Sequence, residues 1–237
     1  MFELATSLSN LDLPKVVLAI GSLGTAAYGV VDATKGFGGG VSNRGFGDIK
    51  KVVSKLIPAD SANVAPGAAL NLASALRTLR ANWLNGVVLG DQKSVAKALI
   101  KLNLTPGNAS QMATATGVDK DVLTSVATKM GSATPLSPQE TDVYGRFDLL
   151  LSALLDQGYQ RADQRYRNSA KLAAVFVAIF LAVLGGRIVV GAAFFSNGSE
   201  VLRAFIAGLL ATPLAPVAKD VSSAIQAAAK AAQSWSK

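Results

Sequence analysis

The sequence predicts an all-α integral membrane protein with three transmembrane helices and a helical cytoplasmic domain inserted between the first and second of them. Three observations lead to this fold class. Half of the 237 residues are hydrophobic and only 16% are charged, whereas soluble domains carry about 25% charged residues. Three apolar stretches are close to the ~20 residues with which a helix crosses a bilayer. Between the first and second stretches, apolar residues recur at helical spacing.

The first apolar stretch covers residues 14–31 and follows a short N-terminus, residues 1–13, that we expect outside the membrane. Glu3 and Asp12 precede the stretch, whereas a secretory signal peptide begins with positive charge, so we expect an uncleaved span. Three glycines in it are candidates for close helix packing: Gly21, Gly24 and Gly29. A flexible glycine-rich joint, residues 32–47, follows; it lacks the GxxxxGK[ST] pattern of a phosphate-binding loop.

Residues 48–171 are predicted to form the cytoplasmic domain. The segment 67–84 carries one apolar face at helical spacing. Residues 108–130 have the spacing of a helix-turn-helix motif, but its second helix would begin with Asp119 and Asp121, two acids that DNA phosphates repel. We therefore expect two packed helices here, and the sequence disfavours a nucleic-acid partner.

A capping box predicts where the longest helix begins. Ser137 can cap a free amide, Glu140 three residues later can reach back to the cap, and Pro138 suits a first helical turn. We expect this helix to run from the domain into the second apolar stretch, residues 172–195, with a bend near Gly158 or near the next glycine pair. That pair supplies two further candidates for helix packing: Gly185 and Gly186.

The second apolar stretch and the third, residues 201–217, are predicted to form an antiparallel hairpin, because only a polar turn at residues 196–200 separates them. Arg187 lies near the far end of the second stretch, where we expect it to reach the interface and pair with Glu200. Together with Arg203, these residues are the candidates for a pore or an interface. The third stretch is expected to kink at its two prolines and to lead into an amphipathic C-terminal helix, residues 218–237.

The charge distribution predicts an orientation. Lysine and arginine close to the apolar stretches concentrate in residues 32–171 and 218–237, and such residues favour the cytoplasmic side. We therefore place the chain in the cytoplasmic (inner) membrane, with the N-terminus outside and the domain and C-terminus in the cytoplasm. The net charge of +8 then needs no nucleic acid to explain it. Six basic residues are candidates for contact with anionic lipid: Lys50, Lys51, Arg161, Arg165, Arg167 and Lys171.

The composition also limits the chemistry. Cysteine and histidine are absent, which excludes thiolate nucleophiles, Ser-His pairs and imidazole ligands for metal or haem. No acidic residues converge in a metal-binding pattern, so we expect no catalytic, cofactor-binding or metal-binding residues. The sequence favours a non-enzymatic membrane protein that contacts lipid and forms a homo-oligomeric scaffold or pore. Two alternatives are an accessory subunit of a larger membrane complex and a membrane-tethered helix-turn-helix regulator.

Overall fold

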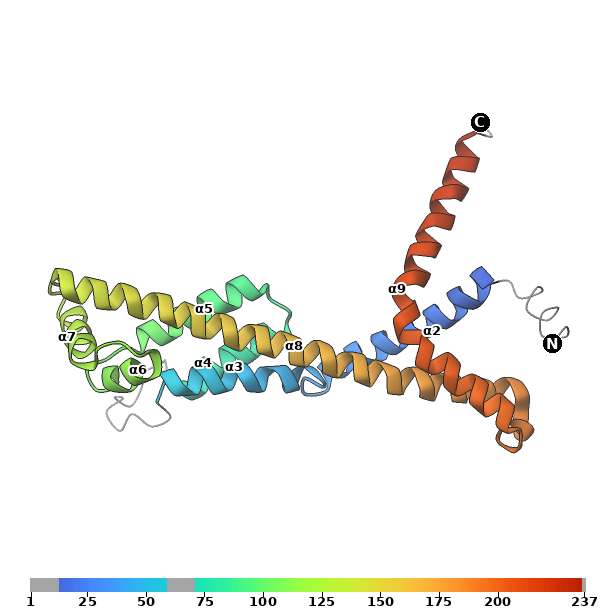
Figure 1. Ribbon diagram of the computed structural model, residues 1–237, viewed down its shortest axis with the longest axis horizontal. Coiled ribbons are helices and arrows are strands. Elements are labelled where there is room, and N and C mark those ends of the chain that lie inside the picture. Colours follow the sequence, from blue (N-terminus) through green and yellow to red (C-terminus); the bar gives the residue numbers. More distant parts are fainter. Residues whose placement is uncertain (1–12, 59–70, 236–237) are drawn as a thin grey trace. The chain divides into compact units, whose positions relative to one another are not determined.

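The all-α class predicted from the sequence is confirmed: every element in the computed structural model, which describes residues 13–58 and 71–235, is helical (Figure 1). The predicted external N-terminus, except for Leu13, lies outside the described residues. In chain order the elements are α2 (Leu13–Ala33), the short 3-10 helix η1 (Thr34–Gly36), α3 (Ser42–Leu56), α4 (Leu72–Leu84), α5 (Leu89–Leu102), α6 (Ala109–Thr116), α7 (Lys120–Gly131), α8 (Pro138–Val190), the 3-10 helix η2 (Gly191–Ser196) and α9 (Gly198–Trp235).

The chain divides into two units. Residues 1–41 and 168–237 form one, here called the terminal unit, and residues 42–167 form the other, the inserted unit. The inserted unit covers much of the stretch 48–171 that the sequence analysis assigned to a domain. Helix α8 contributes its first thirty residues to the inserted unit and the remainder to the terminal unit.

The inserted unit has a core of large apolar side chains. Its interior holds large apolar side chains from every helix of the unit, including Ile49, Leu79, Ile100 and Met112. Burying such a side chain stabilises a fold by about 1.5–3 kcal/mol. The predicted apolar face of residues 67–84 is confirmed, because its members belong to this core or pack against it: Leu72, Leu76, Leu79 and Trp83.

Helix α8 contributes one buried row to the core of the inserted unit. Its fully buried side chains recur at an almost constant interval of four residues: Phe147, Leu151, Leu155, Tyr159 and Ala162. Residues four apart lie nearly above one another on a helix, so this row forms one continuous face. Burial raises the pKa of the Tyr159 hydroxyl, which donates a hydrogen bond to the backbone oxygen of Gln92 at 3.3 Å.

The glycine-rich segment between the units is only partly a loop. Gly38, Gly39 and Gly40 adopt positive φ angles, but α3 already begins at Ser42, so residues 42–47 are helical and not part of a flexible joint. Gly45 is needed for packing: a Cβ atom there would lie 2.6 Å from the Ala162 carbonyl oxygen and 2.7 Å from the Trp83 ring. The absence of a side chain at Gly45 therefore lets α3 approach both α4 and α8.

Helix α8 runs without interruption from Pro138 to Val190, so neither Gly158 nor Gly185–Gly186 breaks it (Figure 1). It ends at Gly191, whose φ of 81° is a left-handed conformation that favours glycine.

Helix α9 likewise continues through Pro213 and Pro216, although a separate C-terminal helix was expected from residue 218. It changes direction along its length (Figure 1), as expected where prolines remove helical hydrogen bonds. The tail's last two residues lie outside the described range, as do most of the side chains on which its amphipathic character depends.

Candidate functional site in the apolar helices

Helices α2 and α9 of the terminal unit pack through small residues. A Cβ atom on Gly21 would overlap the Ala218 side chain and lie 2.9 Å from the Leu214 carbonyl oxygen. A Cβ atom on Gly24 would overlap the backbone of Ala211 in the same way. Close contact of small residues is the usual packing of helices in lipid, where no hydrophobic effect drives helices together. The two glycines that the sequence marked for packing thus serve a contact within the chain.

Helices α8 and α9 also approach closely, through a residue that the sequence analysis missed. A Cβ atom on Gly208 of α9 would lie 2.5 Å from the Cα atom of Ile179 on α8. Ala174, Ala178 and Ala211 are fully buried in the same cluster. The signal was present in the sequence as small residues spaced three or four apart on α9, at positions 208, 211, 215 and 218.

The outer surface of these helices carries the large apolar side chains. On α8, Leu172, Phe176, Phe180 and Leu184 lie four apart on one face and are 45–65% exposed. On α9 the large exposed apolar residues are Leu202, Phe205, Ile206, Leu209, Leu210 and Val217. The helix contacts of the terminal unit are therefore formed mainly by alanine and glycine, while large leucine and phenylalanine side chains lie on its outer surface. In the inserted unit, large apolar side chains fill the interior. Among the described residues, three helices are long and apolar enough to cross a membrane: residues 14–36, the C-terminal part of α8, and residues 198–224.

The remaining candidate packing glycines have different surroundings. Gly29 on α2 and Gly185 on α8 have no atom within 4 Å of a Cβ position, so they face open space. Gly186 is covered by the ring of Phe194, which would lie 2.5 Å from a Cβ atom there. Phe194 is buried as η2 folds back onto α8.

The charged residues near the hairpin do not pair as expected. Glu200 accepts a hydrogen bond from Arg203, one turn along α9, at 2.8 Å. Arg187 is half-buried and has no ion-pair partner among the described residues. The local pair forms because residues three apart already lie side by side on a helix, whereas a pair with Arg187 would have to bridge the hairpin.

The six candidate lipid-contacting bases belong to both units and have different surroundings. In the inserted unit, Arg165 lies 3.2 Å from Asp48 and Lys51 lies 3.9 Å from it, while Arg167 pairs with Asp163 at 2.7 Å. The other three are exposed and have no ion pair among the described residues: Lys50, Arg161 and Lys171. Lys51 and Arg161, two of the six candidates for contact with anionic lipid, line the same cavity of the inserted unit.

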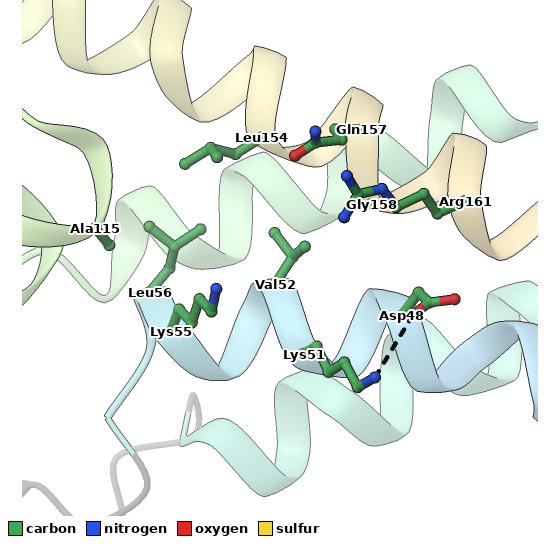
Figure 2. Close-up of a pocket in the computed structure, with 10 residues that line it drawn as sticks. All are labelled: Asp48, Lys51, Val52, Lys55, Leu56, Ala115, Leu154, Gln157, Gly158 and Arg161. Carbon is green, nitrogen blue, oxygen red and sulfur yellow. Dashed lines mark ion pairs between the residues drawn. The ribbon is translucent and has the colours of Figure 1, made fainter.

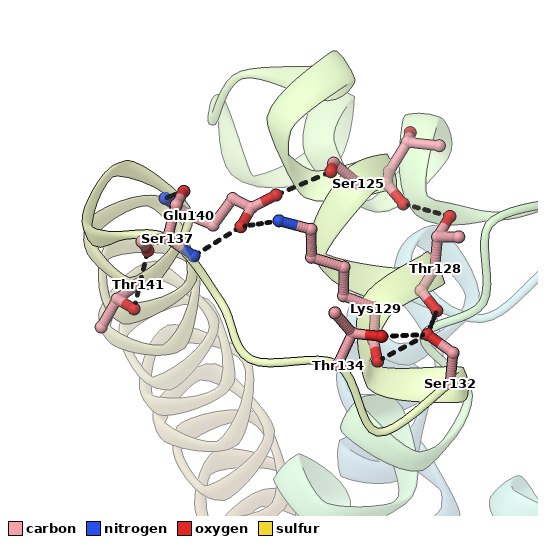
Figure 3. Close-up of polar contacts among 9 residues, drawn as sticks. Ser125, Thr128, Lys129, Ser132, Thr134, Ser137, Glu140 and Thr141 are labelled. Carbon is pink, nitrogen blue, oxygen red and sulfur yellow. Dashed lines mark hydrogen bonds and ion pairs between the residues drawn. The ribbon is translucent and has the colours of Figure 1, made fainter.

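A polar network fixes the start of α8 (Figure 3). The predicted capping box is formed: the Ser137 amide donates to Glu140 Oε2 at 2.7 Å, and the Glu140 amide donates to Ser137 Oγ at 3.3 Å. Lys129 and Ser125 of α7 also donate to the Glu140 carboxylate, each at 2.7 Å. These hydrogen bonds, that from Lys129 above all, lower the pKa of Glu140 from 4.5 to about 2. They tie α7 to the beginning of α8.

A second carboxylate holds two lysines on α5. Asp148 accepts hydrogen bonds from Lys97 at 2.6 Å and Lys101 at 3.0 Å. Desolvation opposes ionisation of Asp148, but the two lysines together outweigh it and lower its pKa. Desolvation likewise opposes the charge on Lys101, yet Asp148 and the nearby Tyr144 raise its pKa. The cluster thus attaches α5 to α8, and both oxygens of the Asp148 carboxylate are engaged by lysines.

Residues 108–130 form the two packed helices that the sequence predicted, α6 and α7. Gly117 ends α6 in a left-handed conformation with φ of 74°. Asp119 caps α7 by accepting hydrogen bonds from the backbone amides of Asp121 and Val122. Ala113 and Leu123 are buried in the core. Lys120 and Asp121 at the start of α7 are exposed, so an acid accompanies the lysine on the surface that a DNA-reading helix would present.

Within residues 13–58 and 71–235, no group of three or more acidic side chains comes together to hold a metal ion. The described residues do form helix contacts, ion-pair clusters and a basic cavity. No family model, curated protein or solved structure matches the chain.

Proposed function

We propose that the chain is an integral protein of the cytoplasmic membrane whose terminal unit crosses the lipid three times, with the N-terminus outside and the inserted unit and C-terminus in the cytoplasm. The observation that carries this proposal is the inverted packing of the terminal unit. Ala174 and Ala178 are buried while Phe176 and Phe180, on the other side of the same helix, are more than half exposed. Water penalises such a surface, whereas lipid solvates it without cost.

We further propose that copies of the chain associate through α2 to form a non-enzymatic scaffold. A row of exposed small residues follows α2 at intervals of three and four: Ala19, Ser22, Ala26, Gly29 and Ala33. The exposed faces of α8 and α9 carry large side chains instead, as lipid-facing surfaces do. Small residues on an outward face are typical of contacts between membrane helices, since they let two backbones approach.

A cross-linking experiment tests the association. The chain has no native cysteine, so Ser22→Cys introduces a single thiol on the row with little change in shape. In native membranes we expect oxidation to yield a disulfide-linked dimer of this variant. Phe176→Cys, on the lipid-facing side of α8, is the matched control and is expected to remain monomeric. Equal cross-linking of the two variants would reflect random collision and would contradict the proposal.

A second variant separates association from folding. Ala26→Leu places a large apolar side chain on the row, which lipid tolerates but a close helix contact does not. In mild detergent, light scattering should give a defined homo-oligomer for the natural chain and a folded monomer for this variant. A monomeric natural chain that co-purifies with other subunits would favour the accessory-subunit alternative.

A pore is the weaker form of the proposal. A water-filled path needs polar or charged lining along its depth, yet the second and third apolar stretches contain only Arg187 and Arg203 as charged residues, and Arg203 is paired. The half-buried Arg187 is the residue that a pore would use to attract anions. Bilayer conductance that loses its anion preference in Arg187→Ala would establish a pore; we expect no conductance.

A further inference from the structure

The inserted unit contains a cavity of about 290 Å³ between α3 and α8, with α6 at one end (Figure 2). All of its lining residues lie within the inserted unit. The cavity is close to the ~300 Å³ at which pockets begin to hold small organic ligands. The cavity therefore forms whether or not the terminal unit lies in a membrane.

Basic side chains dominate the polar part of the lining. Lys51 and Lys55 come from α3, and Arg161 and Gln157 come from α8. In Figure 2 the Arg161 guanidinium extends from α8 into the space between the two helices, and Lys51 points toward Asp48. A set of donors from two facing helices is suited to an anion with several acceptor oxygens.

The cavity has positive charge that the protein itself does not neutralise. Asp48 is the one acid in its lining, and Arg165 and Lys51 already lie beside that carboxylate at 3.2 and 3.9 Å. Lys55 and Arg161 have no ion-pair partner among the described residues. They are exposed at the mouth of the cavity. Four half-buried lysines elsewhere in the unit each meet a carboxylate instead: Lys93, Lys97, Lys101 and Lys129.

The remaining lining residues are apolar, and α3 and α8 lie close together beside them. Val52 and Leu56 of α3 face Leu154 of α8, and Ala115 of α6 closes one end. Gly158 brings the helices together at this point, since a Cβ atom there would lie 2.8 Å from a Val52 methyl group. The cavity thus combines a basic end with an apolar wall, so a bare inorganic ion would leave part of it unfilled.

We propose that this cavity binds a phosphate group carried on a short apolar moiety, with Lys55 and Arg161 holding the phosphate oxygens and Val52, Leu56 and Leu154 contacting the apolar part. Two sources supply this chemistry: a soluble phosphate monoester and the headgroup of an anionic phospholipid. The site goes beyond the proposed scaffold function, because it gives the inserted unit a ligand of its own.

Calorimetric titration of the full chain in a non-ionic detergent tests the site. The probes are inorganic phosphate, monobutyl phosphate and micelle-dissolved phosphatidic acid. Lys55→Gln/Arg161→Gln removes the two unpaired cavity charges. The matched control Lys50→Gln/Arg146→Gln removes two exposed charges from the same helices outside the cavity. Neither double variant breaks an ion pair among the described residues, so both are expected to fold.

We expect monobutyl phosphate to bind more tightly than inorganic phosphate, and the cavity variant to weaken binding by about tenfold or more per lost charge. The control variant should bind like the natural chain. Binding of phosphatidic acid alone, with the same dependence on Lys55 and Arg161, would support the proposal and identify a lipid as the source. Equal binding by the natural chain and the cavity variant, or no binding of any probe at ~10 mM, would overturn it.

Discussion

Gly24 of α2 lies directly against the backbone of Ala211 in α9, so closely that a Cβ atom on Gly24 would come within 2.6 Å of the Ala211 carbonyl carbon. Backbone cannot yield as a side chain can. The pair therefore fixes the distance between two helices that are far apart in the sequence, and any side chain at position 24 must separate them.

Gly24→Ala is accordingly expected to destabilise the terminal unit by about 1–3 kcal/mol, the usual cost of overpacking. For a chain of this size, the thermal midpoint should fall by at least ~3 °C, measured as loss of the monodisperse peak in detergent size-exclusion chromatography. Gly185→Ala on α8, outside the α2 row, is the matched control in the same unit. A Cβ atom there meets nothing within 4 Å and improves helix propensity, so the midpoint should stay the same or rise. Equal losses from both substitutions would show that the contact with Ala211 is not responsible.

The inverted packing predicts unusual responses to two substitutions on α8. Ala178→Leu enlarges a fully buried residue. It should markedly lower the thermal midpoint measured in detergent, because there is no space beside position 178 for a larger side chain. Phe180→Ala removes a side chain that is 65% exposed and should change stability by less than ~1 kcal/mol, although the same change in a water-soluble core costs about 3–5 kcal/mol. A severe loss from Phe180→Ala would mean that this face is buried by protein.

The Glu140 network predicts a specific acid sensitivity. Because folding lowers the pKa of Glu140 from 4.5 to about 2, its ionised form stabilises the fold above pH 4.5, and this contribution is lost as the pH falls toward 2. Glu140→Gln should be less stable than the natural chain at pH 7, with a smaller loss of stability between pH 4.5 and 2. Denaturant unfolding followed by the fluorescence of buried Trp83, in a Trp235→Phe background, measures both effects.

Asp142→Asn is the control for that experiment. Asp142 is exposed two residues further along α8 and has no ion pair among the described residues. Its substitution should leave the pH profile unchanged. If the Glu140→Gln profile matched that of the natural chain, the interaction with Lys129 would contribute nothing to acid stability.

The Asp148 cluster is expected to stabilise the inserted unit more than a surface pair does. Asp148→Asn leaves Lys97 and Lys101 without their shared acceptor and should cost about 1–2 kcal/mol. Asp163→Asn breaks only the i,i+4 pair with Arg167, which is 68% exposed, and should cost under ~0.5 kcal/mol. Chemical unfolding measures the free energy of unfolding of each variant. Equal losses would show that the Asp148 cluster stabilises the unit no more than a surface ion pair does.

Local signals made much of the fold predictable. The capping box at Ser137 and Glu140 depends on residues three apart, and the structure forms it as the spacing predicts. The apolar face ending at Trp83 and the paired helices around Gly117 are local in the same sense. Periodicity and capping depend on residues within one or two helical turns of each other, so these features can be predicted from the sequence alone.

Contacts between distant segments were not predictable in the same way. The sequence marked Gly21 and Gly24 for packing, but their partners on α9 depend on how the helices cross. The grouping of Lys51, Lys55 and Arg161 around one cavity has the same origin. For Glu200 the predicted partner was wrong. An ion pair with Arg187 in the preceding apolar stretch was expected, but Glu200 pairs with Arg203 on its own helix.

Differential labelling of two single cysteines tests membrane insertion most directly. Leu149 in the inserted unit and Phe180 in the terminal unit are similarly exposed, at 72% and 65%, and the natural chain has no thiol. In membrane vesicles of both orientations, Leu149→Cys should react rapidly with a charged maleimide, whereas Phe180→Cys should react only after denaturation in SDS, because lipid covers it. Equally rapid labelling of both positions in intact vesicles would contradict a lipid-embedded terminal unit.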